Sequence, residues 1–262
     1  MILHDFDPVL IDFGFIQIRW YSISYILGIV LGWVYAKKII KNITIKHNFL
    51  AIKQKEFDDL IFYLILGIII GGRLGYVIIY NAEYYLKNLE EILMIWRGGM
   101  SFHGGLLGVI VTTLLYSKKK QLNFFQLTDI LACCTPIGLF FGRIANFING
   151  ELYGKTSDLP WAVIFPSGEN IPRHPSQIYE ALLEGVLLFL IINFLALKKG
   201  LILRKASISI LFLILYSILR IIGEFFREPD SQLGYVFNYF SMGTILSFIT
   251  ILSALFIVFF KK

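Results

Sequence analysis

The chain has 262 residues, 57% of them hydrophobic, and its mean hydropathy is +0.72. Soluble globular domains are roughly 45–50% apolar, so the composition excludes an ordinary soluble enzyme. The formal net charge is +6, but the positive residues are scattered over short segments. Because they do not gather on one face, the charge gives no support for nucleic-acid binding. The sequence therefore indicates an all-α, polytopic membrane protein.

Seven apolar runs are each long enough to cross a bilayer, which takes about 20 helical residues. They span residues 20–37, 58–80, 99–116, 127–149, 176–197, 207–226 and 238–260. The segment before the first run is acidic and no A-x-A-like cleavage site follows that run, so we expect the run to persist as a transmembrane helix. No internal repeat is visible, which disfavours a transporter built from two halves. Cys133 and Cys134 are expected to be small buried hydrophobes and not metal ligands.

Basic residues set the expected orientation, because short cytoplasmic loops are enriched in them. They follow the first, third and fifth runs and end the chain: Lys37, Lys38, Lys41, Lys46, Lys53, Lys55, Lys118, Lys119, Lys120, Lys198, Lys199, Arg204, Lys205, Lys261 and Lys262. The loop between the second and third runs balances its basic residues with glutamates. We therefore predict seven transmembrane helices with the N-terminus outside and the C-terminus inside.

Polar residues within the runs share a depth. A helix rises 1.5 Å per residue, which places Arg73, Arg143 and Arg220 roughly 22, 24 and 20 Å from the inner ends of their runs. His103 lies roughly 6 Å below the outer end of its run, and Tyr21 stands at the outer start of the first. All five fall in the outer half of a core about 30 Å thick. An arginine at the bilayer centre costs roughly 2.5–3.5 kcal/mol, so these residues are expected to serve a function.

Two of the runs carry polar stripes. Arg143, Asn146 and Gly150 follow an i, i+3, i+7 pattern, and Arg220, Glu224 and Arg227 follow an i, i+4, i+7 pattern, each typical of one helix face. Glycines around Arg73 and His103 allow close helix contacts or leave room for a ligand. Arginine forks suit phosphate geometry, so the pattern predicts an outward-opening cavity for a phospholipid headgroup.

Each of these residues also has a structural interpretation. His103 is explained as a hydrogen-bonded core histidine, Arg220 with Glu224 as a structural ion pair, Arg73 as a helix contact, and Glu151 as the cap of the fourth helix. Their convergence at one depth favours a common site over four separate structural roles.

The segment Gly142-Arg143-Ile144-Ala145-Asn146-Phe147-Ile148-Asn149-Gly150-Glu151-Leu152-Tyr153-Gly154 resembles the signature of bacterial prolipoprotein diacylglyceryl transferases. Further matches, in the same order, are Trp20-Tyr21, Gly71-Gly72-Arg73-Leu74-Gly75-Tyr76, Gly98-Gly99-Met100-Ser101-Phe102-His103-Gly104-Gly105, Arg173-His174-Pro175-Ser176-Gln177, and Arg220 through Asp230. They cover nearly the whole chain. One departure is the short stretch from Trp161 to Arg173, which leaves the role of this outer loop open.

The resemblance implies one integral-membrane transferase domain, residues 1–262, in the bacterial plasma (inner) membrane, with its active site toward the outer half. It implies transfer of the diacylglyceryl group of phosphatidylglycerol to the lipobox cysteine of a preprolipoprotein signal peptide, without metal or cofactor. Glycerol phosphate is released in this first step of lipoprotein maturation. The implied catalytic residues are His103, Arg143, Arg220, Tyr21 and Glu151. The implied substrate-binding residues are Arg143, Asn146, Gly154, Arg73, Glu224 and Arg227.

The chemistry agrees with this set, because a thiolate is the nucleophile and arginines stabilise a departing phosphate. His103 is a candidate base for the thiol, and an arginine-rich pocket that lowers the thiol pKa is the alternative. A lipid flippase or anion transporter is the rival function, but it calls for polar residues in both halves of the membrane. A structural membrane subunit would not explain the buried arginines.

Overall fold

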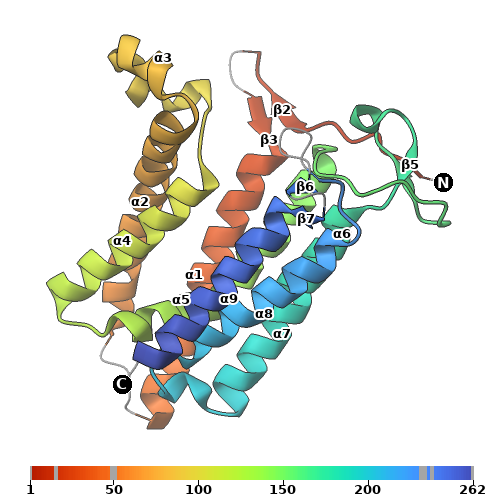
Figure 1. Ribbon diagram of the computed structural model, residues 1–262. Helices are drawn as coiled ribbons and strands as arrows, with labels where there is room; N and C mark the ends of the chain where they lie inside the picture. The colour runs from red at the N-terminus through yellow and green to blue at the C-terminus, as the bar shows by residue number, and fades with distance from the viewer. Residues whose placement is uncertain (1, 15–16, 48–51, 230–234, 237–238, 261–262) are drawn as a thin grey trace. The chain divides into compact units, whose positions relative to one another are not determined.

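The computed structural model describes residues 2–14, 17–47, 52–229, 235–236 and 239–260. The chain is mostly helical (Figure 1). The α-helices are α1 (Trp20–His47), α2 (Gln54–Tyr80), α3 (Ala82–Lys87), α4 (Phe102–Lys120), α5 (Phe124–Ile148), α6 (Ser176–Glu180), α7 (Leu188–Asn193), α8 (Ser207–Glu224) and α9 (Met242–Phe260). The π-helical segment η4 (Ala181–Leu187) joins α6 to α7, and a second one, η5 (Phe194–Lys198), follows α7, so that one helical stretch runs over Ser176–Lys198.

Short elements connect these helices. The 3-10 turns are η1 (Leu89–Leu93), η2 (Ile95–Arg97), η3 (Pro166–Gly168) and η6 (Leu201–Leu203). The strands are β1 (Ile2–Leu3), β2 (Val9–Asp12), β3 (Gln17–Arg19), β4 (Val163–Ile164), β5 (Pro172–Arg173), β6 (Tyr235–Val236) and β7 (Phe240–Ser241). The tail residues Lys261 and Lys262 and the matched residue Asp230 lie outside the described residues.

Six helices of the described chain are long and apolar enough to cross a membrane: Trp20–Ile45, Gln54–Tyr80, Phe124–Ile148, Ser176–Lys198, Ser207–Glu224 and Met242–Phe259. This confirms a polytopic membrane protein. The predicted run 99–116 corresponds to α4, which is helical but is not one of the six. Its first turn carries His103 and two glycines and its last turn three lysines, so it is less apolar than the others. The seventh span and the orientation remain predictions.

The described chain packs as two compact units. The first comprises residues 1–36 and 129–262, and the second comprises residues 37–128. α1 and α5 each contribute to both, because the division falls within these two helices.

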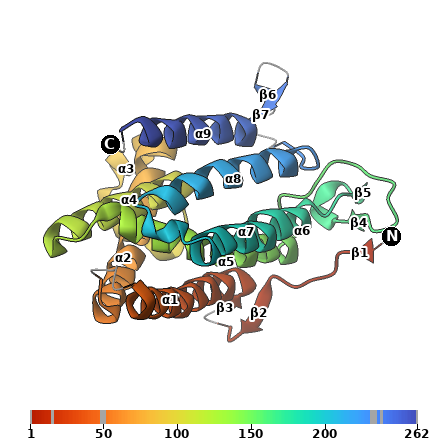
Figure 2. The ribbon, with the colours of Figure 1, turned by 90° about the horizontal axis from the view of Figure 1, so that it is seen from below.

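In the first unit, α1, α5, α7, α8 and α9 form a bundle, and the short strands gather at one end of it (Figures 1 and 2). β1 lies parallel to β4, and β4 lies antiparallel to β5. β2 pairs with β3, and β6 pairs with β7. His4, just after β1, is buried and its Nε2 lies 2.6 Å from the carbonyl oxygen of Phe147. The N-terminal segment is thereby fixed to the end of α5.

Pro136 lies inside α5, where it has no N–H to donate. Proline in a membrane helix is tolerated when neighbouring groups satisfy the carbonyls that it frees. Here the freed carbonyl is that of Ala132, four residues before the proline, and Asn193 Nδ2 donates to the adjacent carbonyl oxygen of Cys133, 3.1 Å away. Tyr35 in turn donates to Asn193 Oδ1 at 2.9 Å. Cys133 and Cys134 are buried free thiols, as predicted.

The second unit is held together by contacts between α2 and α4. A Cβ at Gly71 would lie 2.4 Å from the carbonyl oxygen of Gly104, and one at Gly75 would lie 2.7 Å from the Cα of the same residue. Gly67 and Gly108 form a similar backbone contact one turn further along. These glycines therefore serve close helix packing, and the alternative that they leave room for a ligand does not hold for them.

Candidate anion site in the first unit

Glu180, at the end of α6, lies at the centre of an ion-pair cluster. Its side chain is fully buried. Glu180 Oε1 lies 2.7 Å from Arg220 Nη1 and 3.4 Å from Arg227 Nη1, and its Oε2 lies 3.0 Å from Arg143 Nε. Arg143 from α5 and two arginines from α8 and the segment after it thus meet at one carboxylate.

Glu184 bridges two of these arginines. It accepts from Arg143 Nε and Nη2 through Oε2, at 3.2 and 3.0 Å, and from Arg220 Nη1 through Oε1, at 3.3 Å. Glu184 is fully buried and lies in the π-helical segment η4. Single turns of π-helix occur frequently at functional sites, and this one lies where two glutamates four residues apart face the same arginines.

The third carboxylate of the cluster is Glu224, which pairs with Arg220 Nη2. A Cβ at Gly243, in α9, would collide with this pair, so the glycine allows α9 to pack against it. The structure brings Arg143 and Arg220 together, since both pair with Glu180 and Glu184. It also confirms the ion pair between Arg220 and Glu224.

Two details of the predicted stripes are wrong. α8 ends at Glu224, so Arg227 is not on the helix stripe; it lies in the following segment, where it forms an isolated β-bridge with Gly154. α5 ends at Ile148, so Gly150 also lies beyond its helix, with a φ of +63° that favours glycine. In both places the helix ends before the last residue of the predicted stripe.

The six charges of the cluster balance, since Arg143, Arg220 and Arg227 face Glu180, Glu184 and Glu224. Arg143 is the most exposed of the three arginines, with 16% of its side chain accessible against 11% and 8% for the other two. Within the described residues, Arg143 Nη1 donates no hydrogen bond, because the contacts of Arg143 involve only Nε and Nη2. The cluster therefore has an unused donor edge at its most accessible arginine.

The loop after α5 is fixed by polar side chains. Asn146 is buried and its Nδ2 donates to Glu151 Oε1 at 2.7 Å. Gln177, also buried, donates from Nε2 to the backbone carbonyl oxygen of Glu151 at 2.7 Å. Glu151 itself is exposed. Its carboxylate is therefore held by Asn146 at an accessible position.

Gly154 has a clear packing role. It is buried, and a Cβ there would lie 2.5–2.6 Å from the backbone oxygens of Phe226 and His174. Its N–H donates to the carbonyl oxygen of His174 at 2.9 Å. Gly154 thus joins the segment before α6 to the segment after α8. Glu180 lies in α6 and Arg220 lies in α8, so this contact links two helices that carry residues of the cluster.

Tyr21, half-buried at the start of α1, contacts Tyr25 with ring centroids 5.3 Å apart.

Arg73, in the second unit, has different partners. Its guanidinium donates to the backbone carbonyl oxygens of Glu91, Ile92, Gly98 and Gly99 at 2.5–3.1 Å. It also lies 5.1 Å from the ring centroid of Tyr85. These contacts fix the loop between α3 and α4, and they support the structural interpretation of Arg73.

His103 lies in the first turn of α4, in the second unit, and is exposed. Its ring contacts Phe102 at 5.6 Å between centroids. Ser101 caps the helix by accepting from the Gly104 N–H at 3.2 Å. His103 makes no hydrogen bond within the described residues, so it is not the hydrogen-bonded core histidine of the structural interpretation.

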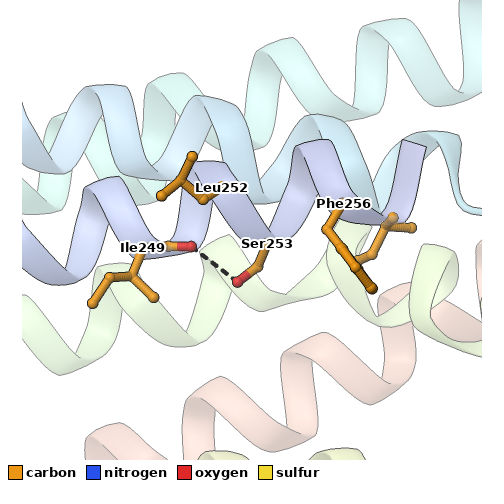
Figure 3. A pocket seen from close by; sticks show the side chains of 5 residues that line it. Ile249, Leu252, Ser253 and Phe256 are labelled. Atoms are coloured by element: carbon orange, nitrogen blue, oxygen red, sulfur yellow. Dashed lines mark hydrogen bonds between the residues drawn. The ribbon is translucent and has the colours of Figure 1, made fainter. Parts of the chain in front are cut away.

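A shallow groove of about 450 Å³ lies along α9 and is lined by Ile249, Leu252, Ser253, Phe256 and Ile257 (Figure 3). Ser253 donates to the carbonyl oxygen of Ile249 at 2.9 Å, so its hydroxyl is satisfied within the helix. The lining offers no charged group to a headgroup. We therefore place the candidate site at the arginine cluster and not at this groove.

Sequence reasoning missed Glu180 and Glu184. The available signal was a pair of glutamates four residues apart within the apolar run 176–197, where an unpaired charge is expensive.

Within the described residues, no group of three or more His, Cys, Asp or Glu side chains is arranged to hold a metal ion.

These features describe a multi-pass membrane protein with a buried, charge-balanced cluster of three arginines and three glutamates. The model of the prolipoprotein diacylglyceryl transferase family matches residues 8–260, and the chain belongs to that family.

Similar proteins are named phosphatidylglycerol--prolipoprotein diacylglyceryl transferase. The protein from Rickettsia bellii is 46% identical over 98% of this chain and 96% of its own length. The one from Nitrobacter hamburgensis is 47% identical over 97% of this chain and 87% of its own. The one from Rickettsia canadensis is 48% identical over 94% and 93%.

Proposed function

We propose that the chain transfers the diacylglyceryl group of phosphatidylglycerol to the thiol of a lipobox cysteine in a preprolipoprotein. The observation that carries this proposal is the unused Nη1 edge of Arg143 beside a balanced cluster. A guanidinium held by carboxylates on one edge and open on the other is preorganised for a phosphate. The family and the names of its members supply the substrate and the acceptor.

In the proposed reaction, the cysteine sulfur forms a bond to the glyceryl carbon that carries the phosphate. The bond between that carbon and the bridging oxygen breaks, and its electron pair stays on the oxygen. Glycerol phosphate leaves with an additional negative charge, while the thiol proton passes to a base. Arg143 stabilises the charge that develops on the phosphate, and Arg220 supports the same site from the other side of Glu184.

The thiol must lose its proton, because the thiolate is the nucleophile. His103 is the proposed base: it is exposed at the start of α4, and within the described residues its ring nitrogens make no hydrogen bond. We further propose that Tyr21 and Glu151 take part in catalysis and that Asn146 and Gly154 take part in substrate binding. Asn146 would hold the Glu151 carboxylate at the site, and Gly154 would hold the loops that carry it.

The proposal includes a topology: seven transmembrane helices with α4 as the third, the N-terminus outside and the site in the outer half of the plasma (inner) membrane. Both units would belong to one functional domain. Reporter fusions after Lys119 and after Lys198 test the orientation. We expect both positions to report as cytoplasmic, and an external signal at either one would contradict the topology.

The direct test of the function uses purified protein, radiolabelled phosphatidylglycerol and a lipobox peptide, with products separated by thin-layer chromatography. We expect label on the peptide and release of glycerol phosphate, and no label on a peptide whose cysteine is replaced by serine. Movement of labelled lipid between leaflets without a covalent product would instead favour a lipid flippase.

A further inference from the structure

We propose that Glu184 is a positioning residue that competes with substrate and product for Arg143 and Arg220, and so limits how tightly the site holds an anion. The inference rests on the proposed function, because the anion is taken to be a lipid phosphate before the reaction and glycerol phosphate after it.

The geometry of Glu184 carries this inference. Its two carboxylate oxygens are divided between two arginines, with Oε2 on Arg143 at 3.0–3.2 Å and Oε1 on Arg220 at 3.3 Å. A carboxylate that accepts two donors from one guanidinium occupies the position in which a phosphate would bind that fork. Glu184 is thus an internal anion at the site, and it is fully buried.

Glu180 cannot have the same role. It contacts all three arginines of the cluster, so its loss would leave three buried cations with less compensation. Breaking a buried charge network by removing one partner is strongly destabilising. Glu184 contacts two arginines, and both retain another carboxylate when it is neutralised, namely Glu180 for Arg143 and Glu180 with Glu224 for Arg220.

The balance of charge explains why such a residue would be useful. With Glu184 ionised, three carboxylates offset three guanidinium groups. When the carbon–oxygen bond breaks, the phosphate gains a negative charge and binds the arginines more strongly. A fixed carboxylate weakens that attraction, which allows the product to leave.

The test is Glu184→Gln, which keeps the size of the side chain and removes its charge. Binding of radiolabelled glycerol phosphate to the detergent-solubilised protein is measured by equilibrium dialysis. We expect the dissociation constant to fall by roughly 100- to 1000-fold, since a unit charge is lost roughly 4–6 Å from the anion at an effective dielectric constant near 20. Turnover should fall and the KM for phosphatidylglycerol should not rise.

Two matched variants separate this role from a merely structural one. Glu184→Asp restores the charge and should bind glycerol phosphate within about threefold of the wild type. Asp129→Asn changes another buried acid of the same unit, which accepts from the N–H and hydroxyl of Ser209 at the start of α8. It should lower thermal stability without changing the dissociation constant.

An unchanged or weaker affinity in Glu184→Gln would overturn the inference. If that variant does not fold, Glu224→Gln takes its place, because Glu224 contacts Arg220 alone among the arginines of the cluster. In that variant we expect a smaller fall in the dissociation constant for glycerol phosphate. An unchanged dissociation constant would overturn the inference. Transfer by the wild-type protein is measured separately, so failure of the proposed function and failure of this inference give different results.

Discussion

Arg73 and Arg143 are both arginines within helices of a membrane protein, yet the structure uses them in different ways. Arg73 is buried and directs its guanidinium to four backbone carbonyl oxygens in the loop between α3 and α4. Arg143 is held by two carboxylates on one edge, and its Nη1 group makes no hydrogen bond within the described residues. The comparison separates a buried arginine whose donors are all directed to a loop from one whose donor set is incompletely used, and we propose the second as the ligand site.

The largest effect expected from this comparison is that of Arg143→Ala. The change removes the open donor edge, so transfer should become undetectable or fall by more than roughly 10²–10³-fold, the usual range for loss of one charge-stabilising donor. Arg143→Lys should rescue poorly, because lysine lacks the planar fork. The thin-layer assay at matched membrane abundance measures both, and near-wild-type turnover of Arg143→Ala would remove the headgroup role.

The next effect in size concerns the proposed base, His103. If His103 is the base, His103→Gln should lower turnover by roughly 10²–10⁴-fold. The loss should shrink as the pH rises toward about 8.5, the ordinary pKa of a thiol, because the substrate then ionises unaided. Rates from pH 6 to 9 are measured beside phosphatidylglycerol binding. A loss that is independent of pH and accompanied by weaker lipid binding would assign His103 to ordering the pocket instead.

A smaller effect, on stability, is expected from Arg73→Gln. The change leaves loop carbonyls without their donors, and each unsatisfied group costs about 1–3 kcal/mol when it is buried. The melting temperature should fall while the KM for phosphatidylglycerol stays within about threefold of the wild-type value. A tenfold higher KM with an unchanged melting temperature would show that Arg73 binds substrate after all.

The smallest effect concerns His174, in the loop before α6. Burial, and secondly the charge of Lys155, lower the pKa of His174 below its usual value. The unfolded chain therefore takes up the proton first, and the folding stability that depends on His174 is lost as the pH falls below about 6.5. His174→Gln should flatten the melting temperature between pH 5 and 7. An equally steep pH dependence in the variant would exclude this role.

Much of the fold could be predicted because membrane helices follow from hydropathy. The helix boundaries were less predictable, since α8 and α5 end where loop contacts take over. Arg227 leaves the predicted stripe for this reason, and Gly150 adopts a positive φ beyond Ile148.

The arginines of the site were predictable because buried cations are rare in membrane helices. Their partners Glu180 and Glu184 had a signal, since two glutamates lie four residues apart in an apolar run, but the π-helical turn that carries Glu184 has no evident signal in the sequence. The hydrogen-bond partners of Arg73 also depend on the conformation of the loop between α3 and α4, which the amino-acid composition does not specify.

Lipid binding by Arg143→Ala and Arg73→Gln tests the central claim most directly. Each purified variant is titrated with phosphatidylglycerol in detergent micelles, in the absence of acceptor peptide. The account predicts that Arg143→Ala loses at least tenfold in affinity, while Arg73→Gln binds within about threefold of the wild type. Equal losses in the two variants, or a larger loss in Arg73→Gln, would contradict it.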